Sequence, residues 1–247
     1  MKRPFQVLLA VVLFALVFTL VVAPASAKRS GTIDVQILAL NDFHGNLLPP
    51  GGSSGRVGTV DAGGVEYLAT HINNLRALNP NTVVVSAGDM IGASPLLSAL
   101  FHDEPTIEAF NLIGLDFNAV GNHEFDEGVY ELLRMQKGGC HPEDGCLDGD
   151  GFEGADFRFL AANVTWKKND KPIFPAYKVK TFKGVKIAFI GMTLEGTPSI
   201  VTPSGISELN FLDEAETVNA LVPWLKRQGI ETIVVLIHEG GVQNPNT

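Results

Sequence analysis

Four short apolar runs constrain the fold of this chain most, because polar side chains follow each of them. The runs cover residues 33–40, 82–85, 117–120 and 232–237. Their length, their β-branched residues and their Gly, Asn and Asp neighbours are typical of buried parallel strands. Between them, apolar residues recur at helical spacing in two segments: Val65, Leu68, Ala69, Ile72 and Leu75, then Ala215, Val218, Val222 and Leu225. This alternation predicts an α/β fold with a parallel sheet.

The side chains that follow the runs are candidate metal ligands. Asp42 and His44 follow the first run, Asp89 the second, Asn122 the third and His238 the fourth. Carboxyl ends of parallel strands lie along one edge of a sheet, and ligands bind there. We therefore expect these scattered residues to meet in a single site.

Carboxylate, imidazole and amide donors suit Zn²⁺, Mn²⁺, Fe or Co better than they suit Mg²⁺ or Ca²⁺. The two oxygens of Asp89 allow it to bridge two ions. Two ions ~3.5–4 Å apart can generate hydroxide near neutral pH and clamp a phosphoryl oxygen. Taken singly, each such residue is better explained as a turn cap or a structural histidine. We keep that structural interpretation for His71, His102 and His141, which do not follow apolar strands.

Four motifs in order resemble those of the calcineurin-like metallophosphoesterases, and more narrowly the exported bacterial 5′-nucleotidase and UDP-sugar hydrolase group. They are Asn-Asp-Phe-His-Gly at 41–45, Gly-Asp-Met at 88–90, Gly-Asn-His-Glu-Phe-Asp at 121–126 and Ile-His-Glu-Gly at 237–240. The third is the most specific. The resemblance implies a layered β sandwich flanked by helices, with ligands at the C-terminal ends of strands.

The resemblance also implies a role for each ligand. Asp42 and His44 would bind one divalent ion, Asp89 would bridge, and Asn122 and His238 would bind the second ion.

Two further residues of the third motif would act on the substrate. His123 resembles the catalytic histidine beside the phosphate, and Asp126 the carboxylate that orients it. We expect a helix over residues 126–136 that places Asp126 in its first turn. For Glu124 we expect only a favourable charge near a helix start.

The implied activity is two-metal hydrolysis of nucleoside 5′-phosphates or related nucleotides. UDP-sugar hydrolysis, 2′,3′-cyclic nucleotide hydrolysis and a non-catalytic metal- or nucleotide-binding role remain alternatives. The family pattern continues with a His-x-His element and a nucleoside-binding C-terminal domain, which these 247 residues do not contain. We therefore expect residues 28–247 to be a catalytic domain that is incomplete at its C-terminus. The sequence predicts neither the base preference, the native metals nor the oligomeric state.

The N-terminus predicts export to the periplasm, the cell surface or the medium. Lys2 and Arg3 precede an apolar stretch over residues 7–23 and an Ala-Ser-Ala pattern at 25–27, which indicates a signal peptide over residues 1–27. An uncleaved anchor is the alternative, because the stretch is slightly long. Cleavage would remove two cations and no acid, moving the formal charge from −9 to −11. We expect no nucleic-acid binding by so acidic a protein without a basic patch, and membrane contact only through the signal segment.

Cys140 and Cys146, the only cysteines, lie in a long loop over residues 138–156. In an exported protein a local disulfide is the simplest prediction. A metal site with His141 is the alternative, although it lacks an evident fourth ligand.

Overall fold

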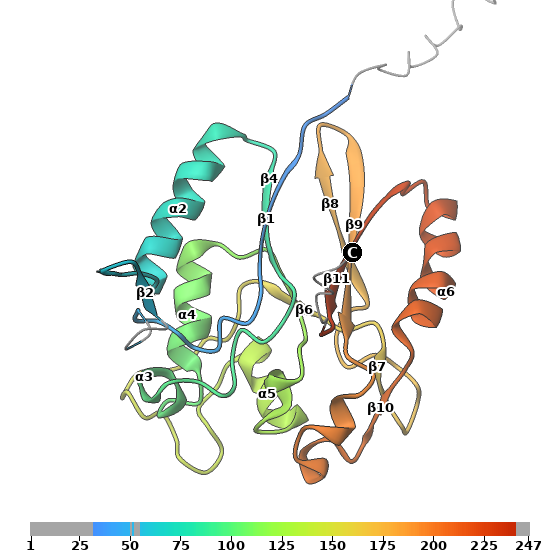
Figure 1. Cartoon of the computed structure of the whole chain (residues 1–247). Helices are drawn as coiled ribbons and strands as arrows, with labels where there is room; N and C mark the ends of the chain where they lie inside the picture. Colours follow the sequence, from blue (N-terminus) through green and yellow to red (C-terminus); the bar gives the residue numbers. More distant parts are fainter. Residues whose placement is uncertain (1–31, 50, 52–54, 241–247) are drawn as a thin grey trace, which may run out of the picture. The chain divides into compact units, whose positions relative to one another are not determined.

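Figure 1 shows a computed structural model of the chain, which describes residues 32–49, 51 and 55–240. The predicted signal peptide therefore lies outside the described residues. The described residues from Asp34 to Gly240 form one compact unit. Within the described ranges, no helix combines the length and the apolar character that crossing a bilayer requires.

The first sheet contains the first three apolar runs. Its strand order is β1-β4-β5-β6, with every neighbouring pair parallel. The strands are β1 (Gln36–Leu40), β4 (Thr82–Ser86), β5 (Phe117–Ala119) and β6 (Arg158–Leu160). The parallel arrangement confirms the expectation for these three runs.

The fourth run, β11 (Thr232–His238), belongs to a second sheet. It pairs in parallel with β9 (Val185–Thr193), which forms an antiparallel hairpin with β8 (Tyr177–Phe182). The expectation that one parallel sheet would hold all four runs was therefore wrong. The hairpin begins a new sheet, and β11 adds to that sheet rather than to the first.

The two sheets pack face to face, as the period-two alternation of strand side chains requires. Val83 and Val85 of β4 share a buried cluster with Phe189 of β9. Val84 points the other way, into a cluster with the helices beside the first sheet. Ala188 of β9 likewise packs on the opposite side of the second sheet.

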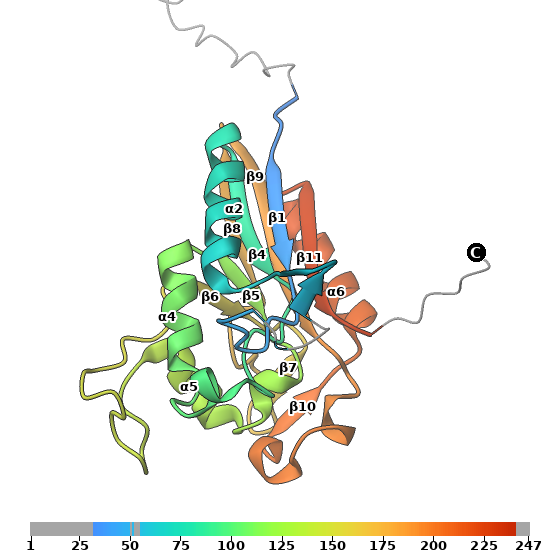
Figure 2. The ribbon, with the colours of Figure 1, turned by 60° about the vertical axis from the view of Figure 1, so that its left-hand side comes forward.

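Helices cover both outer faces (Figures 1 and 2). Against the first sheet pack α2 (Val65–Leu78), α4 (Glu104–Ile113) and α5 (Val129–Lys137). Against the second packs α6 (Glu214–Arg227), whose first turn is capped by Asp213, which accepts the N–H of Glu216. The predicted layered β sandwich flanked by helices is thus confirmed.

Short elements complete the described chain. They are β2 (Arg56–Val57), β3 (Val60–Asp61), α3 (Leu96–Ala99), η2 (His123–Phe125), β7 (Val164–Trp166), η3 (Thr197–Ser199), η4 (Pro203–Ile206) and β10 (Leu209–Phe211). The predicted helix over residues 126–136 was partly wrong. Gly128, at φ 87°, separates the 3₁₀ turn η2 from α5.

Candidate active site

The loops that follow β1 and β4 are joined by backbone hydrogen bonds beyond the ends of the strands. The amide of Asp42 donates to Gly88 O at 3.0 Å, and that of His44 to Asp89 O at 3.0 Å. Asp42, His44 and Asp89 have positive φ angles of 52°, 46° and 52°. Such backbone is strained at a non-glycine residue and persists only where surrounding contacts hold it. The paired loops therefore hold three predicted ligands in orientations that a free loop would rarely adopt.

Two histidines from different sheets point the same ring atom at Asp89. Nε2 of His238 lies 3.1 Å from Asp89 Oδ2, and Nε2 of His44 lies 3.7 Å from that oxygen. Nδ1 of His238 lies 3.0 Å from Ala87 O, and Nδ1 of His44 lies 2.9 Å from Gly92 O. With Nδ1–H donated to these carbonyls, the Nε2 atom of each ring is directed toward Asp89, and in the neutral ring it is the atom that could bind a metal ion.

The other two predicted ligands lie beside these histidines. Asn122 Oδ1 is 3.1 Å from Nε2 of His238, and Asp42 Oδ1 is 3.8 Å from Nε2 of His44. One donor atom each from Asp42, Asp89 and His238 lie within 4.8 Å of one another. Oxygen and imidazole donors without thiolate fit Zn²⁺, Mn²⁺, Fe or Co. The donor atoms collected around Asp89 therefore fit a divalent metal ion.

Asp89 is buried and His238 is half-buried, and their side chains form an ion pair. Burial by itself would raise the pKa of Asp89, but hydrogen bonds from His238 and from the backbone N–H of His123 lower it. Burial would likewise lower the pKa of His238, whereas Asp89 raises it to about 9. A proton on His238 thus occupies the place of a cation, and metal binding requires its release.

The 3₁₀ turn η2 brings His123 and Asp126 together. Residues three apart eclipse one another in a 3₁₀ helix, and Nδ1 of His123 lies 2.9 Å from Asp126 Oδ2. The same oxygen accepts the N–H of Ala93 at 3.0 Å. The ring of His123 meets that of His44 edge-on, with centroids 5.0 Å apart. His123 is thereby oriented beside the predicted ligands, as expected, although by a tighter turn than the predicted helix.

For Glu124 only a favourable charge near a helix start was expected, but the structure gives it a larger part. Its side chain is only 3% exposed. Oε2 accepts the N–H groups of Asp89 and Gly121 at 2.9 and 2.8 Å, and Oε1 accepts that of Met90 at 3.0 Å and the side-chain amide of Asn118 at 3.1 Å. Glu124 therefore ties the loop after β4 to the loop after β5 underneath the site.

The charge of Glu124 is set by opposing effects. Burial, and then the nearby charge of Asp89, raise the pKa of Glu124 to about 7, while its hydrogen bonds oppose the shift. The single feature in the sequence that could have revealed Glu124 is its place inside the most specific motif.

Two glycines allow the loops to approach each other. A Cβ on Gly121 would lie 2.1 Å from Asp89 Oδ1, and one on Gly88 would lie 2.9 Å from Nδ1 of His238. Real Cβ atoms do not approach so closely, so both positions require glycine. This contact explains why glycine precedes both Asp89 and Asn122.

Two cavities border the predicted residues. A cavity of about 280 Å³ is lined by His123, Asp126, His102 and Glu127 among others. A larger cavity of about 680 Å³ lies beside Asp42 but does not reach His123. The smaller cavity is the one that the predicted catalytic residue His123 lines.

A two-sheet sandwich between helices, with these donors at its strand ends, defines a fold of the metallophosphoesterase type. Residues 35–245 match the calcineurin-like phosphoesterase family, and the chain belongs to that family. Its members are phosphoester hydrolases that use divalent metal ions, and the donors collected around Asp89 agree with that use.

The chain is also similar to individual proteins of known name, over only part of their length. The chain is 40% identical over 221 residues to the endonuclease YhcR of Bacillus subtilis, covering 87% of this chain and 18% of that protein. It is 31% identical over 242 residues to the NAD 5′-nucleotidase of Haemophilus influenzae, covering 94% of this chain and 36% of that protein. A solved NAD nucleotidase from the same organism superposes with a TM-score of 0.67 and 29% identity, over 84% of this chain and 34% of that one. The chain thus spans about a third or less of these relatives.

Proposed function

We propose that this chain is the catalytic part of an exported two-metal phosphoesterase that hydrolyses nucleoside 5′-phosphates or related nucleotides. One observation carries the proposal: Asp89 lies between Nε2 atoms of His44 and His238. A shared carboxylate between two imidazoles is the arrangement that two adjacent divalent ions need.

The ligands divide into two groups around that carboxylate. Asp42 and His44 would hold one ion, Asn122 and His238 the other, and Asp89 both, which the distances given above support. When bound, the ions supply Lewis-acid chemistry: they activate water and neutralise charge on the phosphoryl oxygens.

His123 would protonate the leaving alkoxide or stabilise the transferring phosphoryl group. Burial tends to lower the pKa of His123, but its hydrogen bond with Asp126 and the charge of that carboxylate raise it above the usual value. The raised pKa favours the protonated ring that a general acid needs. Because Asp126 holds Nδ1, the free Nε2–H is the proton donor.

The substrate assignment rests on relatives. The name NAD 5′-nucleotidase describes a 31% identical protein, and we extend its chemical class, a nucleotide phosphoester, to this chain. A second candidate is hydrolysis within a nucleic-acid strand, favoured by the 40% identity to a protein named as an endonuclease. It runs against the acidic charge of −9.

His123→Asn tests the proposal. We expect turnover of a nucleoside 5′-phosphate to fall roughly 10²–10⁴-fold while the metal content measured by elemental analysis is unchanged. The loss should shrink with a nitrophenyl ester, whose leaving group needs little protonation. Loss of an ion would instead make His123 a ligand, and unchanged turnover would refute its catalytic role.

The substrate class is tested on the same preparation. Wild-type protein loaded with Zn²⁺ or Mn²⁺ should release phosphate from nucleoside 5′-phosphates, with UDP-sugars, 2′,3′-cyclic nucleotides and single-stranded DNA assayed in parallel. Preference for DNA would select the second candidate. Two bound ions without any hydrolysis would select a non-catalytic binding role.

A further inference from the structure

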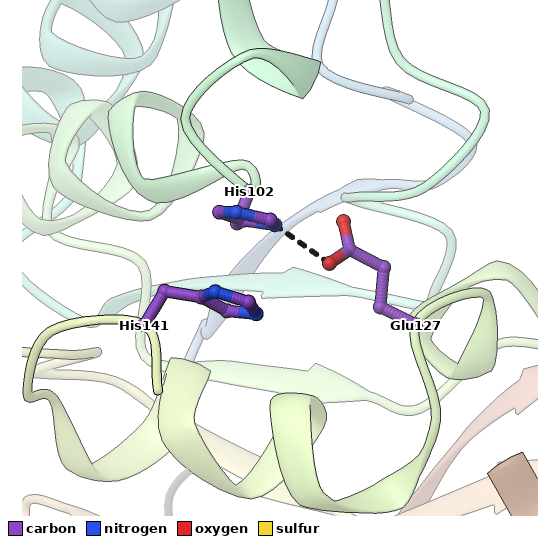
Figure 3. Close-up of side chains that lie close together, drawn as sticks. All are labelled: His102, Glu127 and His141. Carbon is purple, nitrogen blue, oxygen red and sulfur yellow. Dashed lines mark hydrogen bonds and ion pairs between the residues drawn. The ribbon is translucent and has the colours of Figure 1, made fainter. Parts of the chain in front are cut away.

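Three ionisable side chains that the family motifs do not include, His102, Glu127 and His141, lie close together (Figure 3), and Asp144 lies beside His102. The rings of His102 and His141 stack with centroids 3.8 Å apart and planes 11° apart. Nδ1 of His102 lies 2.7 Å from Glu127 Oε2, and Nε2 lies 3.0 Å from Asp144 Oδ2. The two rings are 16% and 14% exposed. Only His141 was considered as a metal ligand from the sequence, together with the cysteines, because the members of this cluster lie in three separate polar segments.

The cluster is held rigidly from two of its sides. His102 lies in the turn between α3 and α4 with a left-handed φ of 51°, a strained backbone that marks functional positions. His141 lies inside the loop that the Cys140–Cys146 disulfide closes. Within that loop, His141 and Gly145 exchange backbone hydrogen bonds of 3.1 and 2.9 Å. The disulfide confirms the predicted pairing and removes both thiols from any metal site.

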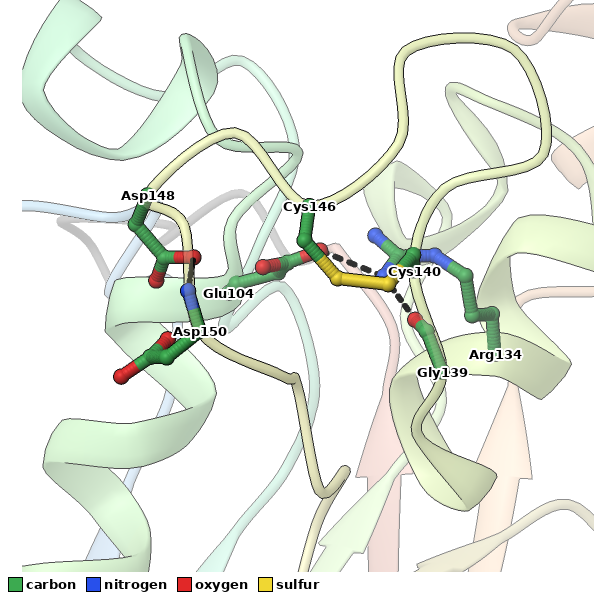
Figure 4. The surroundings of a disulfide bond; sticks show 7 residues. All are labelled: Glu104, Arg134, Gly139, Cys140, Cys146, Asp148 and Asp150. Atoms are coloured by element: carbon green, nitrogen blue, oxygen red, sulfur yellow. Dashed lines mark hydrogen bonds and ion pairs between the residues drawn. A yellow bond between two sulfur atoms is a disulfide. The ribbon is translucent and has the colours of Figure 1, made fainter.

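An ion-pair network anchors the disulfide loop to the domain (Figure 4). The guanidinium of Arg134, 8% exposed, donates to Gly139 O at 2.7 Å and pairs with Glu104 and Glu131. It also lies over the ring of Phe152, 5.1 Å from the centroid. Arg134 of α5 therefore holds the start of the loop, next to Cys140, against the domain.

The cluster has more negative than positive charge. With both rings neutral, Glu127 and Asp144 give the cluster two negative charges. Burial would lower the pKa of His102, yet its hydrogen bonds and charge interactions with Glu127 and Asp144 raise it. A bound cation would stabilise this cluster by offsetting the negative charge of its carboxylates.

We propose that His102, Glu127 and His141 bind a further divalent ion, Zn²⁺, separate from the pair at Asp89. One donor atom from each residue lies within 4.8 Å of the others. A tetrahedral ion with bonds of about 2.0–2.1 Å needs its donors roughly 3.3–3.5 Å apart and must lie in the plane of each ring. The donors must therefore approach by about 1 Å, and the two rings must turn out of their parallel stack. Two imidazoles and a carboxylate are a frequent Zn²⁺ donor set.

Asp144 is placed to accept the second ring N–H of His102, as carboxylates do beside metal-binding histidines. With Nδ1 of His102 on the ion, Nε2–H donates to Asp144 Oδ2, which already lies 3.0 Å away. A carboxylate that accepts the second ring proton fixes the tautomer and strengthens the ligand. The ion would clamp the disulfide loop onto the wall of the 280 Å³ cavity that His123 also lines.

Metal counting separates this site from the proposed catalytic pair. The oxidised full chain is stripped with chelator, reloaded with Zn²⁺, dialysed and analysed by elemental analysis. We expect His102→Asn and His141→Asn each to lose one ion per chain relative to wild type. His71→Asn, at an exposed histidine of α2, and Glu143→Gln, at an exposed acid of the same loop, are the matched controls and should lose none.

A second preparation leaves the cluster intact. In the Asp89→Asn/His238→Asn double variant we expect one Zn²⁺ to remain, and Co²⁺ in its place to give the strong visible absorption of a tetrahedral site. No bound ion in that variant, or equal metal content in wild type and both cluster variants, would overturn the proposal. If no ions bind at Asp89, the proposed function fails, but His102→Asn and His141→Asn should still each lose one ion. The two proposals can therefore be refuted independently.

Discussion

Asp126 Oδ2 accepts hydrogen bonds from two donors, Nδ1–H of His123 at 2.9 Å and the backbone N–H of Ala93 at 3.0 Å. The ring of His123 is therefore oriented by a carboxylate that is itself fixed to the loop after β4. A shift of that loop would move the histidine together with the predicted ligand Asp89.

Asp126→Asn should lower turnover about 10–100-fold, as removal of a ring-orienting partner commonly does. The uncharged amide oxygen accepts hydrogen bonds more weakly than the carboxylate does, and the amide NH₂ can donate to Nδ1. The ring of His123 therefore loses its fixed tautomer. The metal content should stay constant, and the alkaline limb of the pH–rate profile should move to lower pH, because the carboxylate no longer raises the pKa of His123. An unshifted profile would contradict this role.

Glu124→Gln should reduce the free energy of unfolding by about 1–3 kcal/mol. The amide nitrogen of the glutamine would face N–H donors of Asp89, Met90 or Gly121 in a site that is 3% exposed. Urea denaturation measures the change. Glu143→Gln, on the exposed loop, should stay within about 0.5 kcal/mol of wild type.

Gly121→Ala should impair metal binding and activity more than its one added carbon suggests. The new Cβ would lie 2.1 Å from Asp89 Oδ1 and 2.6 Å from Asp89 N, and such overpacking costs about 1–3 kcal/mol. Gly151→Ala meets no atom within 4 Å and is the control. Equal Zn²⁺ affinity of the two variants in calorimetric titration would show that the loops can separate without consequence.

The metal-free protein should lose stability as the pH rises above about 6.5. The pKa of His102 is raised in the folded state, so its favourable contribution is complete below the unfolded pKa and disappears as the pH passes the higher folded pKa. Thermal unfolding in chelator from pH 5 to 9 should show this decline. It should be smaller in Glu127→Gln, which lacks the main partner of His102; identical curves would count against the pairing.

The local features of the fold could be predicted because each depends on the residues of one short segment. The runs before Asp42, Asp89 and Asn122 became neighbouring parallel strands, and the disulfide followed from two cysteines in one loop. The second sheet could not be predicted in this way, because the choice of partner for β11 depends on the distant β8–β9 hairpin.

The same limit applies to the site. The strand-end residues were recognisable by chemistry and position. Glu124 acts through four partners on other segments, and the stacking of His102 on His141 joins two loops. Neither relationship has a periodic or compositional signal, since tertiary packing alone creates both.

The hydrogen bonds that join the loops after β1 and β4 also govern how the site can open. The amides of Asp42, His44 and Gly45 donate across the two loops, so their hydrogens exchange with solvent only when the loops part. That parting separates Asp42 and His44 from Asp89 in a single event. An ion held by Asp42 and His44 would then lose its contact with Asp89, at a rate that the slow exchange of these three amides would report.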